Sequence, residues 1–260
     1  MGIVNVTPDS FSDGGRFLDP DTAVEHGLRL LAEGADALDV GGESSRPGAA
    51  PVAAGVEIAR VVPVIAGLAR RAPGALLSVD TTKAEVARAA LDAGANIVND
   101  VSAGDDPAML PLVAAAGAAI VLMHRRGSPA TMQLDTGYDD VVSEVHDFLA
   151  ARAAAARAAG IAAGRILLDP GIGFGKDAGG NLRLLRELPA LARLGHAVVV
   201  GASRKSFIGA LCDAPVEERL AGSLAVLADA ARLERLVVRV HDVAATVQFL
   251  TLLAAVRGAA

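Results

Sequence analysis

The sequence predicts an α/β fold of the (β/α)8 TIM-barrel type, formed as a single domain by residues 1–260. Short apolar runs of strand length alternate with amphipathic helical segments along the whole chain. Counting them gives eight strand–helix units with repeats of roughly 20 to 45 residues. No Pro/Ser-rich linker or block of charge divides the chain, so one barrel accounts for its length.

The composition favours many helices packed on parallel strands and a small-molecule partner. Apolar residues make up 52% of the chain and aromatic residues only 3%, so Ala, Val, Leu and Ile build the core. The formal net charge of -6 gives no general attraction to nucleic acid or to an anionic membrane. We therefore expect small molecules as partners, with no nucleic acid and no membrane.

The single cysteine, Cys212, excludes an internal disulfide and a zinc site built on cysteines. Its place in a helical pattern favours a packed thiol over a nucleophile. The residues after Met1 lack the basic segment and long apolar stretch of a signal peptide. The longest apolar run, residues 112–123, is shorter than the roughly 18 residues of a membrane span. The expected location is the cytoplasm.

Eight apolar runs predict the strands, and each is followed by polar residues and a turn or glycine-bearing loop. They are residues 1–4, 35–40, 76–79, 97–98, 119–123, 166–168, 197–200 and 236–240. Helical periodicity lies between them. The first helix is expected at about residues 21–33, before Gly34, and the second at roughly 56–71. Thr81 and Thr82 are placed to cap the third helix.

Polar side chains stand where these strands end. Each alone is explained as a cap or a packing residue, and His124 in particular as a hydrogen-bonded packing residue. Parallel strands in a barrel, however, put all their carboxyl ends on one face. The residues that should meet there are Asn5, Asp80, Asn99, His124, Asp169, Lys205 and His241.

The loop after the sixth strand, residues 171–176, resembles a phosphate-binding loop at first sight. Its glycine-to-lysine spacing is one residue short, and Asp177 stands where a Ser or Thr is required. No nucleotide loop is predicted.

Two cationic segments point instead to an anion. Side chains alternate along a strand, so Arg239 and His241 face the same side and form a predicted anion site. Arg204 and Lys205 open a helix, where adjacent cations oppose the macrodipole and so call for a ligand or partner. Arg46, beside two serines, either grips an anion or lies solvated.

Five motifs, taken together and in order, resemble the dihydropteroate synthase family. They are MGIVNVTPDSFSDGG at residues 1–15, ESSRPG at 43–48, DPGIGFGK at 169–176, SRK at 203–205 and RVHDV at 239–243. The resemblance runs from the first residue to the final helix. It implies an enzyme that condenses 6-hydroxymethyl-7,8-dihydropterin diphosphate with 4-aminobenzoate, giving 7,8-dihydropteroate and diphosphate for folate synthesis.

The resemblance also implies roles for individual residues. Asp80, Asn99 and Asp169 would pair with the pterin edge, with Lys205 beside the ring. The chemistry agrees, because an aminopyrimidinone presents donors and acceptors that carboxylates and an amide can match. Asn5 would meet diphosphate-bound Mg²⁺, the implied cofactor.

The remaining roles concern the diphosphate and the second substrate. Arg239 and His241 would hold the diphosphate oxygens, and Asp80, Lys205, Arg239 and His241 form the expected catalytic set. The 4-aminobenzoate pocket, where sulfonamides compete, would be shaped by Ser45, Arg46, Lys205 and Ser206. Phe174 is a further expected substrate-binding residue. The implied reaction is a dissociative displacement without a covalent nucleophile, and the implied assembly is a homodimer.

Two other functions remain open from the sequence. A related pterin-binding barrel that presents a methylfolate to a corrinoid partner would share the carboxylates but would not need residues 203–205 together with Arg239 and His241. A non-catalytic pterin-binding paralogue would keep the fold with damaged loops.

Residues 7–15 and 44–48 are polar and glycine-flanked, so we expect them to become ordered when diphosphate binds.

Overall fold

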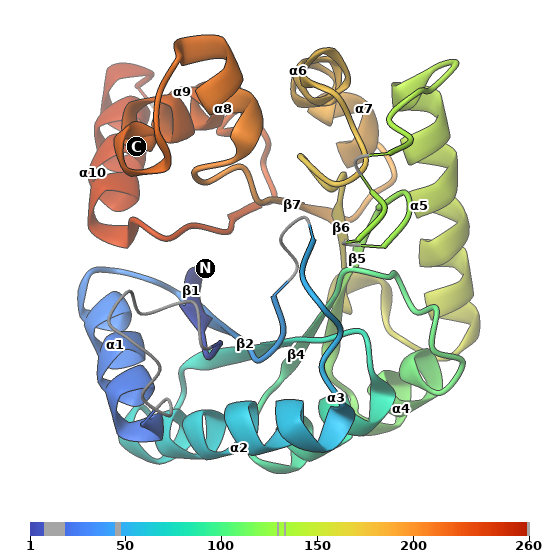
Figure 1. The fold of residues 1–260 in the computed structure, drawn as a ribbon, viewed down its shortest axis with the longest axis vertical. Helices are drawn as coiled ribbons and strands as arrows, with labels where there is room; N and C mark the ends of the chain where they lie inside the picture. The colour runs from blue at the N-terminus through green and yellow to red at the C-terminus, as the bar shows by residue number, and fades with distance from the viewer. Residues whose placement is uncertain (8–18, 45–47, 129, 133, 259–260) are drawn as a thin grey trace.

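Eight parallel strands follow one another around a barrel in chain order (Figure 1). The computed structural model describes residues 1–7, 19–44, 48–128, 130–132 and 134–258. The ring closes where Gly2 forms a parallel bridge with Val240. The strands are β1 (Gly2–Asn5), β2 (Ala37–Gly41), β3 (Leu76–Asp80), β4 (Ile97–Asp100), β5 (Ala119–Met123), β6 (Ile166–Asp169), β7 (Ala197–Val200) and β8 (Leu236–Val238).

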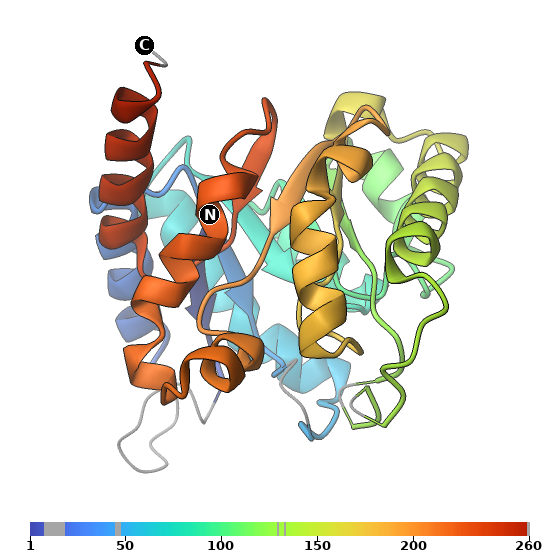
Figure 2. The ribbon, with the colours of Figure 1, turned by 90° about the horizontal axis from the view of Figure 1, so that it is seen from above.

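Helices cover the outside of the barrel (Figure 1). Seen from above, the loops that follow the strands lie on one side of the molecule and the end of the last helix lies on the other (Figure 2). The helices are α1 (Pro20–Ala32), α2 (Ala54–Arg71), α3 (Ala84–Asp92), α4 (Met109–Ala116), α5 (Val141–Ala158), α6 (Ala178–Arg186), α7 (Leu188–Ala192), α8 (Ser206–Cys212), α9 (Leu220–Ala230) and α10 (Val243–Val256).

Side-chain alternation divides the core into two apolar regions and one polar layer. Outward residues of the strands, such as Leu38 and Val79, pack under the helices in the main core. Inward residues form a separate apolar cluster of Met1, Ala37, Ile97, Val121 and Val199. Nearer the carboxyl ends of the strands, the inward positions become polar. The barrel is thus closed by apolar side chains below and opens onto a polar mouth.

The register of the sheet places several of these polar positions side by side. Asn5 pairs with Gly41, Gly41 with Asp80, and Asp80 with Asn99. The amide of Asn5, the carboxylate of Asp80 and the amide of Asn99 therefore lie at neighbouring points of one rim, and Gly41 leaves a position without a side chain between the first two.

The predicted order and number of strands are confirmed, and the predicted α1 limits are close to those observed. Asp19 caps α1 by accepting a hydrogen bond from the Asp21 N–H at 3.2 Å. Gly34 follows the helix with a φ of +102°, a backbone conformation that favours glycine.

The predicted threonine cap of α3 is wrong. Lys83 occupies the N-cap position without a side-chain cap, and the Ala84 N–H donates to the Asp106 carboxylate at 2.9 Å. Thr81 instead accepts from the Lys83 N–H at 3.2 Å. The carboxylate from the β4–α4 loop replaces the local hydroxyl because tertiary folding brings it to the helix start.

The packed thiol expected at Cys212 is also wrong, because this side chain is exposed at the end of α8. The short helix buries Phe207 and Ile208 on its inner face and leaves its last residue outside.

In the described part of the chain, no helix is both long and apolar enough to cross a membrane.

Candidate functional site

The predicted site residues lie at the carboxyl ends of the strands. Asn5, Asp80 and Asp169 are the last residues of β1, β3 and β6, and Asn99 is the last but one of β4. Arg239 and His241 follow β8, and Lys205 precedes α8. Ser206 opens α8 and is exposed. Ser45 and Arg46, with most of the two loops expected to become ordered, lie outside the described residues.

The centre of the mouth is a charged cluster around Arg239. Its Nε donates to Asp39 at 2.6 Å, and its Nη2 donates to Asp80 at 2.8 Å. The Asn99 amide nitrogen donates to the same oxygen of Asp39 at 3.0 Å. This cluster joins β2, β3, β4 and the end of β8, so residues far apart in the chain fix one another at the mouth.

The buried carboxylates of the mouth can accept further hydrogen bonds from a ligand. Asp39 is completely buried, and its Oδ1 has no hydrogen-bond partner among the described residues. Burial raises the pKa of Asp80 above its ordinary value, although Arg239 opposes the shift. A ligand that donates hydrogen bonds here would relieve part of the cost of burying these oxygens.

Asp169 is buried on the opposite side of the barrel. Its Oδ1 accepts from the Gly171 N–H at 2.7 Å, which fixes the carboxylate at the start of the loop. Burial raises the pKa of Asp169 to about 6, against the opposing effects of the Gly171 N–H and Lys205. At neutral pH it is an ionised acceptor close to the point at which it takes up a proton.

Lys205 and Phe174 form one wall of the mouth. The Lys205 ammonium lies 3.9 Å from the centroid of the Phe174 ring, a cation–π contact. Burial lowers the pKa of Lys205 to about 8, and the neighbouring Arg239 acts in the same direction. Phe174 also belongs to a small apolar cluster with Val101, Met123 and Met132. A flat ring can pack against this surface while its edge reaches the carboxylates.

Asn5 lies on the rim beside Asp80. The Asn5 Oδ1 and the Asp80 Oδ2 are 3.8 Å and 3.7 Å from the position that a Cβ on Gly41 would occupy. Gly41 therefore leaves the space between the two side chains open.

This arrangement has close counterparts among known proteins. Residues 1–241 match the model of the family described as pterin binding enzyme. The dihydropteroate synthase of Mycobacterium leprae is 49% identical, over 98% of this chain and 92% of that protein. The chain belongs to the dihydropteroate synthase family. The family assignment made from the sequence motifs is confirmed.

Solved structures of family members share the fold at similar coverage. A Yersinia pestis dihydropteroate synthase with a sulfonamide drug complex gives a TM-score of 0.93 at 43% identity, over 99% of this chain and 93% of that one. Dihydropteroate synthase from Xanthomonas albilineans in complex with 7,8-dihydropteroate gives 0.88 at 50% identity, over 98% and 92%. The barrel of the synthase family is therefore the fold of this chain.

The sequence interpretation missed Asp39 as a site residue. Asp39 lies inside the predicted second strand and was given no role, although it is hydrogen-bonded to both Arg239 and Asn99. A signal was present, because a carboxylate in the middle of an apolar strand is rarely buried without a partner. Its inward direction follows from alternation with Leu38 and Val40, which are both in the core.

The rejection of a nucleotide loop agrees with the structure. The Lys176 ammonium is buried and donates to the carbonyls of Gly171 and Phe174 at 2.9 Å and of His124 at 3.3 Å. It therefore holds its own loop together rather than projecting toward a phosphate. His124 itself is buried and packs edge-on against Phe148, so it is a packing residue, although its Nδ1 has no hydrogen-bond partner among the residues that the structure describes.

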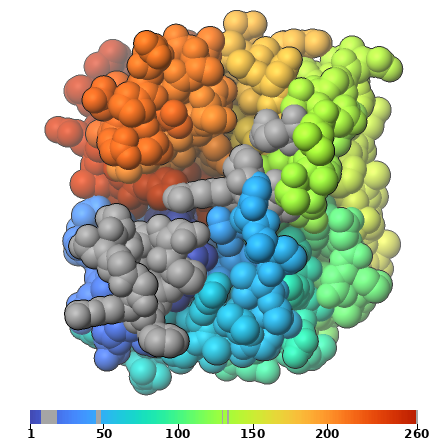
Figure 3. Space-filling view, viewed as in Figure 1, coloured from blue at the N-terminus to red at the C-terminus, as the bar shows by residue number. Residues whose placement is uncertain are grey.

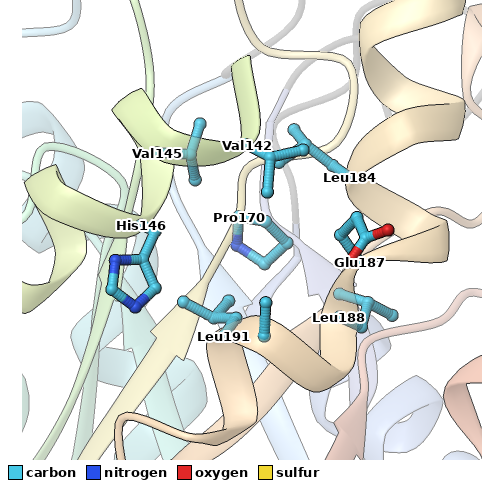
Figure 4. Close-up of a pocket in the computed structure, with 9 residues that line it drawn as sticks. Val142, Val145, His146, Pro170, Leu184, Glu187, Leu188 and Leu191 are labelled. Carbon is cyan, nitrogen blue, oxygen red and sulfur yellow. The ribbon is translucent and has the colours of Figure 1, made fainter. Parts of the chain in front are cut away.

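Two hollows lie near these elements, and they differ in character. One is lined by Asp80, Lys83, Glu43 and Arg125, among others, and borders the mouth. The other lies between α5, α6 and α7, where Val142, Leu184 and Leu188 make it largely apolar (Figure 4). Figure 3 looks onto the face where the strands end, with the segments around α8, the residues that lead into α2 and the loop before α5 around its centre. The hollow that borders the mouth is thus lined by several charged side chains, whereas the one between the helices is lined mainly by apolar ones.

Proposed function

We propose that this member of the family condenses 6-hydroxymethyl-7,8-dihydropterin diphosphate with 4-aminobenzoate, and that the barrel mouth holds both substrates. The observation that carries the proposal is the set of acceptors on β2, β3, β4 and β6 beside a cationic and aromatic wall. The family members with a sulfonamide drug and with 7,8-dihydropteroate support the same substrates.

The pterin would lie across the mouth with its polar edge toward Asp80, Asn99 and Asp169. Carboxylates accept from the ring N–H groups, and the amide supplies both a donor and an acceptor. The flat faces of the ring match the apolar surface at Val101 and Met123. Pairing the buried oxygens is the main source of selectivity, because an analogue without these donors would leave them unsatisfied.

The second substrate would lie on the outer side of the mouth. Lys205, Ser206 and Phe174 border it, and Ser45 and Arg46 are the predicted partners from the β2–α2 loop. The Lys205 ammonium already lies on the Phe174 ring, so a second aromatic ring and a carboxylate can meet the same pair.

The diphosphate would lie against Arg239 and His241. Within the described part of the chain, two of the five guanidinium N–H groups of Arg239 donate, to Asp39 and Asp80, so the other three can serve phosphate oxygens. The two carboxylates thereby orient the guanidinium before the anion arrives.

Mg²⁺ fits this scheme as an ion that arrives with the diphosphate. Within the described residues, no group of three or more His, Cys, Asp or Glu side chains is arranged to hold a metal ion. A single amide oxygen, that of Asn5, suits Mg²⁺, which keeps several waters and takes other ligands from substrate phosphates. When bound, the ion would neutralise charge on the leaving diphosphate.

The residues of the chain then act by position and charge. Arg239 and His241 hold the leaving group, and Asp80 stabilises positive charge that develops on the pterin methylene carbon. The carbon–oxygen bond to the diphosphate breaks, the arylamine nitrogen, placed by Lys205 and Ser206, bonds to that carbon, and the nitrogen then releases a proton to solvent. No covalent nucleophile is required.

The test is turnover of the purified chain with both substrates and Mg²⁺, followed by mass detection of 7,8-dihydropteroate and by release of diphosphate. We expect both products in equal amounts, and inhibition by a sulfonamide that 4-aminobenzoate relieves. Binding of the pterin without any product would instead support a non-catalytic paralogue.

The homodimer and the cytoplasmic location are part of the same proposal. The exposed apolar side chains of α10, Val247, Leu252 and Val256, provide a surface that a second copy can cover. Sedimentation equilibrium should give twice the chain mass, and cell fractionation should place the protein in the cytoplasm.

A further inference from the structure

The loop that carries Lys205 and the loop that carries His241 are joined by hydrogen bonds from the two residues that precede Lys205. Ser203, Arg204 and Lys205 are consecutive, yet each contacts a different partner. Ser203 bonds His241, Arg204 bonds Asp242, and Lys205 lies on the Phe174 ring. The loop before α8 therefore holds the loop after β8 at two successive residues.

Arg204 is fixed in an uncommon backbone conformation. Its φ is +58°, in the left-handed region that costs a non-glycine residue free energy. Its N–H donates to the Ser223 hydroxyl at 2.9 Å, and its carbonyl accepts from Arg219 at 3.3 Å. Its guanidinium donates two hydrogen bonds to the Asp242 carboxylate. These contacts offset the cost and turn Lys205 toward the mouth.

Among the described residues, the Ser203 hydroxyl makes two hydrogen bonds, both with His241. It accepts from the His241 backbone N–H at 3.3 Å and lies 3.0 Å from the imidazole Nδ1. Among the described residues, Nδ1 is the one atom to which this hydroxyl can donate. A hydroxyl that donates to Nδ1 requires the neutral imidazole to carry its proton on Nε2.

We propose that Ser203 and Arg204 are positioning residues for the anion site: Arg204 clips the two loops together through Asp242, and Ser203 holds His241 as the neutral tautomer protonated on Nε2. The inference rests on the proposed role of His241 in diphosphate binding. The Nε2–H form is a hydrogen-bond donor, as a phosphate oxygen requires, and the clip fixes its distance from Lys205 before the substrate arrives. Arg204, whose charge at a helix start called for a ligand or partner, has that partner in Asp242.

The tautomer is tested by ¹⁵N NMR of the histidine-labelled protein, with His241→Gln to assign the signals. At a pH where His241 is neutral, Nδ1 should give the signal of an unprotonated nitrogen that accepts a hydrogen bond. Ser203→Ala should shift that signal, and Ser203→Thr should restore it. A protonated Nδ1 in the parent, or no change in Ser203→Ala, would overturn the assignment.

The clip is tested by calorimetry with inorganic diphosphate and Mg²⁺. Arg204→Asn suits this test because asparagine tolerates the left-handed conformation but cannot reach Asp242. We expect the dissociation constant to rise about tenfold, with a smaller rise in Arg204→Lys, which keeps the charge but loses the fork.

Arg183→Gln is the matched control, because Arg183 pairs with Asp140 in an exposed ion pair between α6 and the start of α5 and contacts neither Asp242 nor His241 in the hydrogen bonds of the described residues. It should leave diphosphate binding unchanged. Equal affinities in Arg204→Asn and in the control would refute the clip. If instead His241→Gln binds diphosphate as tightly as the parent, the proposed function of His241 fails, whatever the tautomer.

Discussion

At the scale of single residues, the buried charge of Asp169 lowers the stability of the fold but supplies a hydrogen-bond acceptor for the substrate. Its folded pKa of about 6 lies above its ordinary value of 3.8, because burial disfavours the ionised form. Its contribution to stability is therefore fully present below pH 3.8 and is lost as the pH rises through about 6. At neutral pH, the same ionised carboxylate costs stability and supplies the acceptor that a pterin needs.

Asp169→Asn should consequently weaken pterin binding without unfolding the protein. An amide in place of the carboxylate puts a donor against a ring donor, which costs on the order of 1–3 kcal/mol of binding free energy. Calorimetry with the pterin and thermal unfolding at pH 7 measure the two effects. We expect lower affinity and a melting temperature that is not reduced.

Asp100→Asn is the control for this substitution. Asp100 is also buried at the end of β4, but its carboxylate accepts from Ser102 and Gly104 within its own loop. It should lose stability while keeping pterin affinity. Unchanged affinity in folded Asp169→Asn would remove Asp169 from the site.

The pH dependence of binding follows from the same pKa. Because the ionised form accepts the ring donors, pterin affinity should fall as the pH drops through about 6. In Asp169→Asn this dependence should become shallower, and a profile identical to that of the parent would show that another group is responsible.

At the scale of elements, the β6–α6 loop is held from inside by one lysine. The Lys176 ammonium donates to three backbone carbonyls, and Asn181 accepts from the Gly173 N–H at 2.6 Å. Gly171 has a φ of +67°, and a Cβ there would lie 1.8 Å from the His124 carbonyl oxygen. The loop that carries Phe174 therefore has one closely determined path.

Lys176→Met should loosen this loop, because three buried carbonyls lose their donor at a cost of about 1–3 kcal/mol. Chemical denaturation should show the lower stability. We also expect weaker 4-aminobenzoate binding in the pterin complex. Stability equal to that of the parent would mean that the carbonyls find other partners.

The elements differ in how far the sequence predicts them. Strands such as β5 and β7 were predicted with their observed limits, because a buried parallel strand needs a continuous apolar run and little else. The cap of α3 was not, since its acceptor, Asp106, belongs to another loop. Local patterns determine the strands and their polar ends, whereas Asp39 gains its role only from contacts made across the barrel.

At the scale of the whole molecule, the barrel brings its first and last strands together. The N-terminal ammonium of Met1 donates to the Val238 carbonyl at 2.9 Å, so β1 and β8 lie side by side. Arg239 then reaches Asp39 and Asp80 on β2 and β3. Substrate acceptors and anion-binding cations thus share one mouth, which is the central feature of the proposed function.

Binding of two ligands to Arg239→Lys tests that feature most directly. Lysine keeps the charge near Asp39 and Asp80 but loses the planar fork that can hold two phosphate oxygens. Calorimetry should compare the dihydropterin diphosphate with the free pterin alcohol, with and without Mg²⁺. We expect about a tenfold loss for the diphosphate and a much smaller loss for the alcohol. Equal losses for both ligands would contradict an anion site at Arg239 and place its effect in the pterin pocket or the fold.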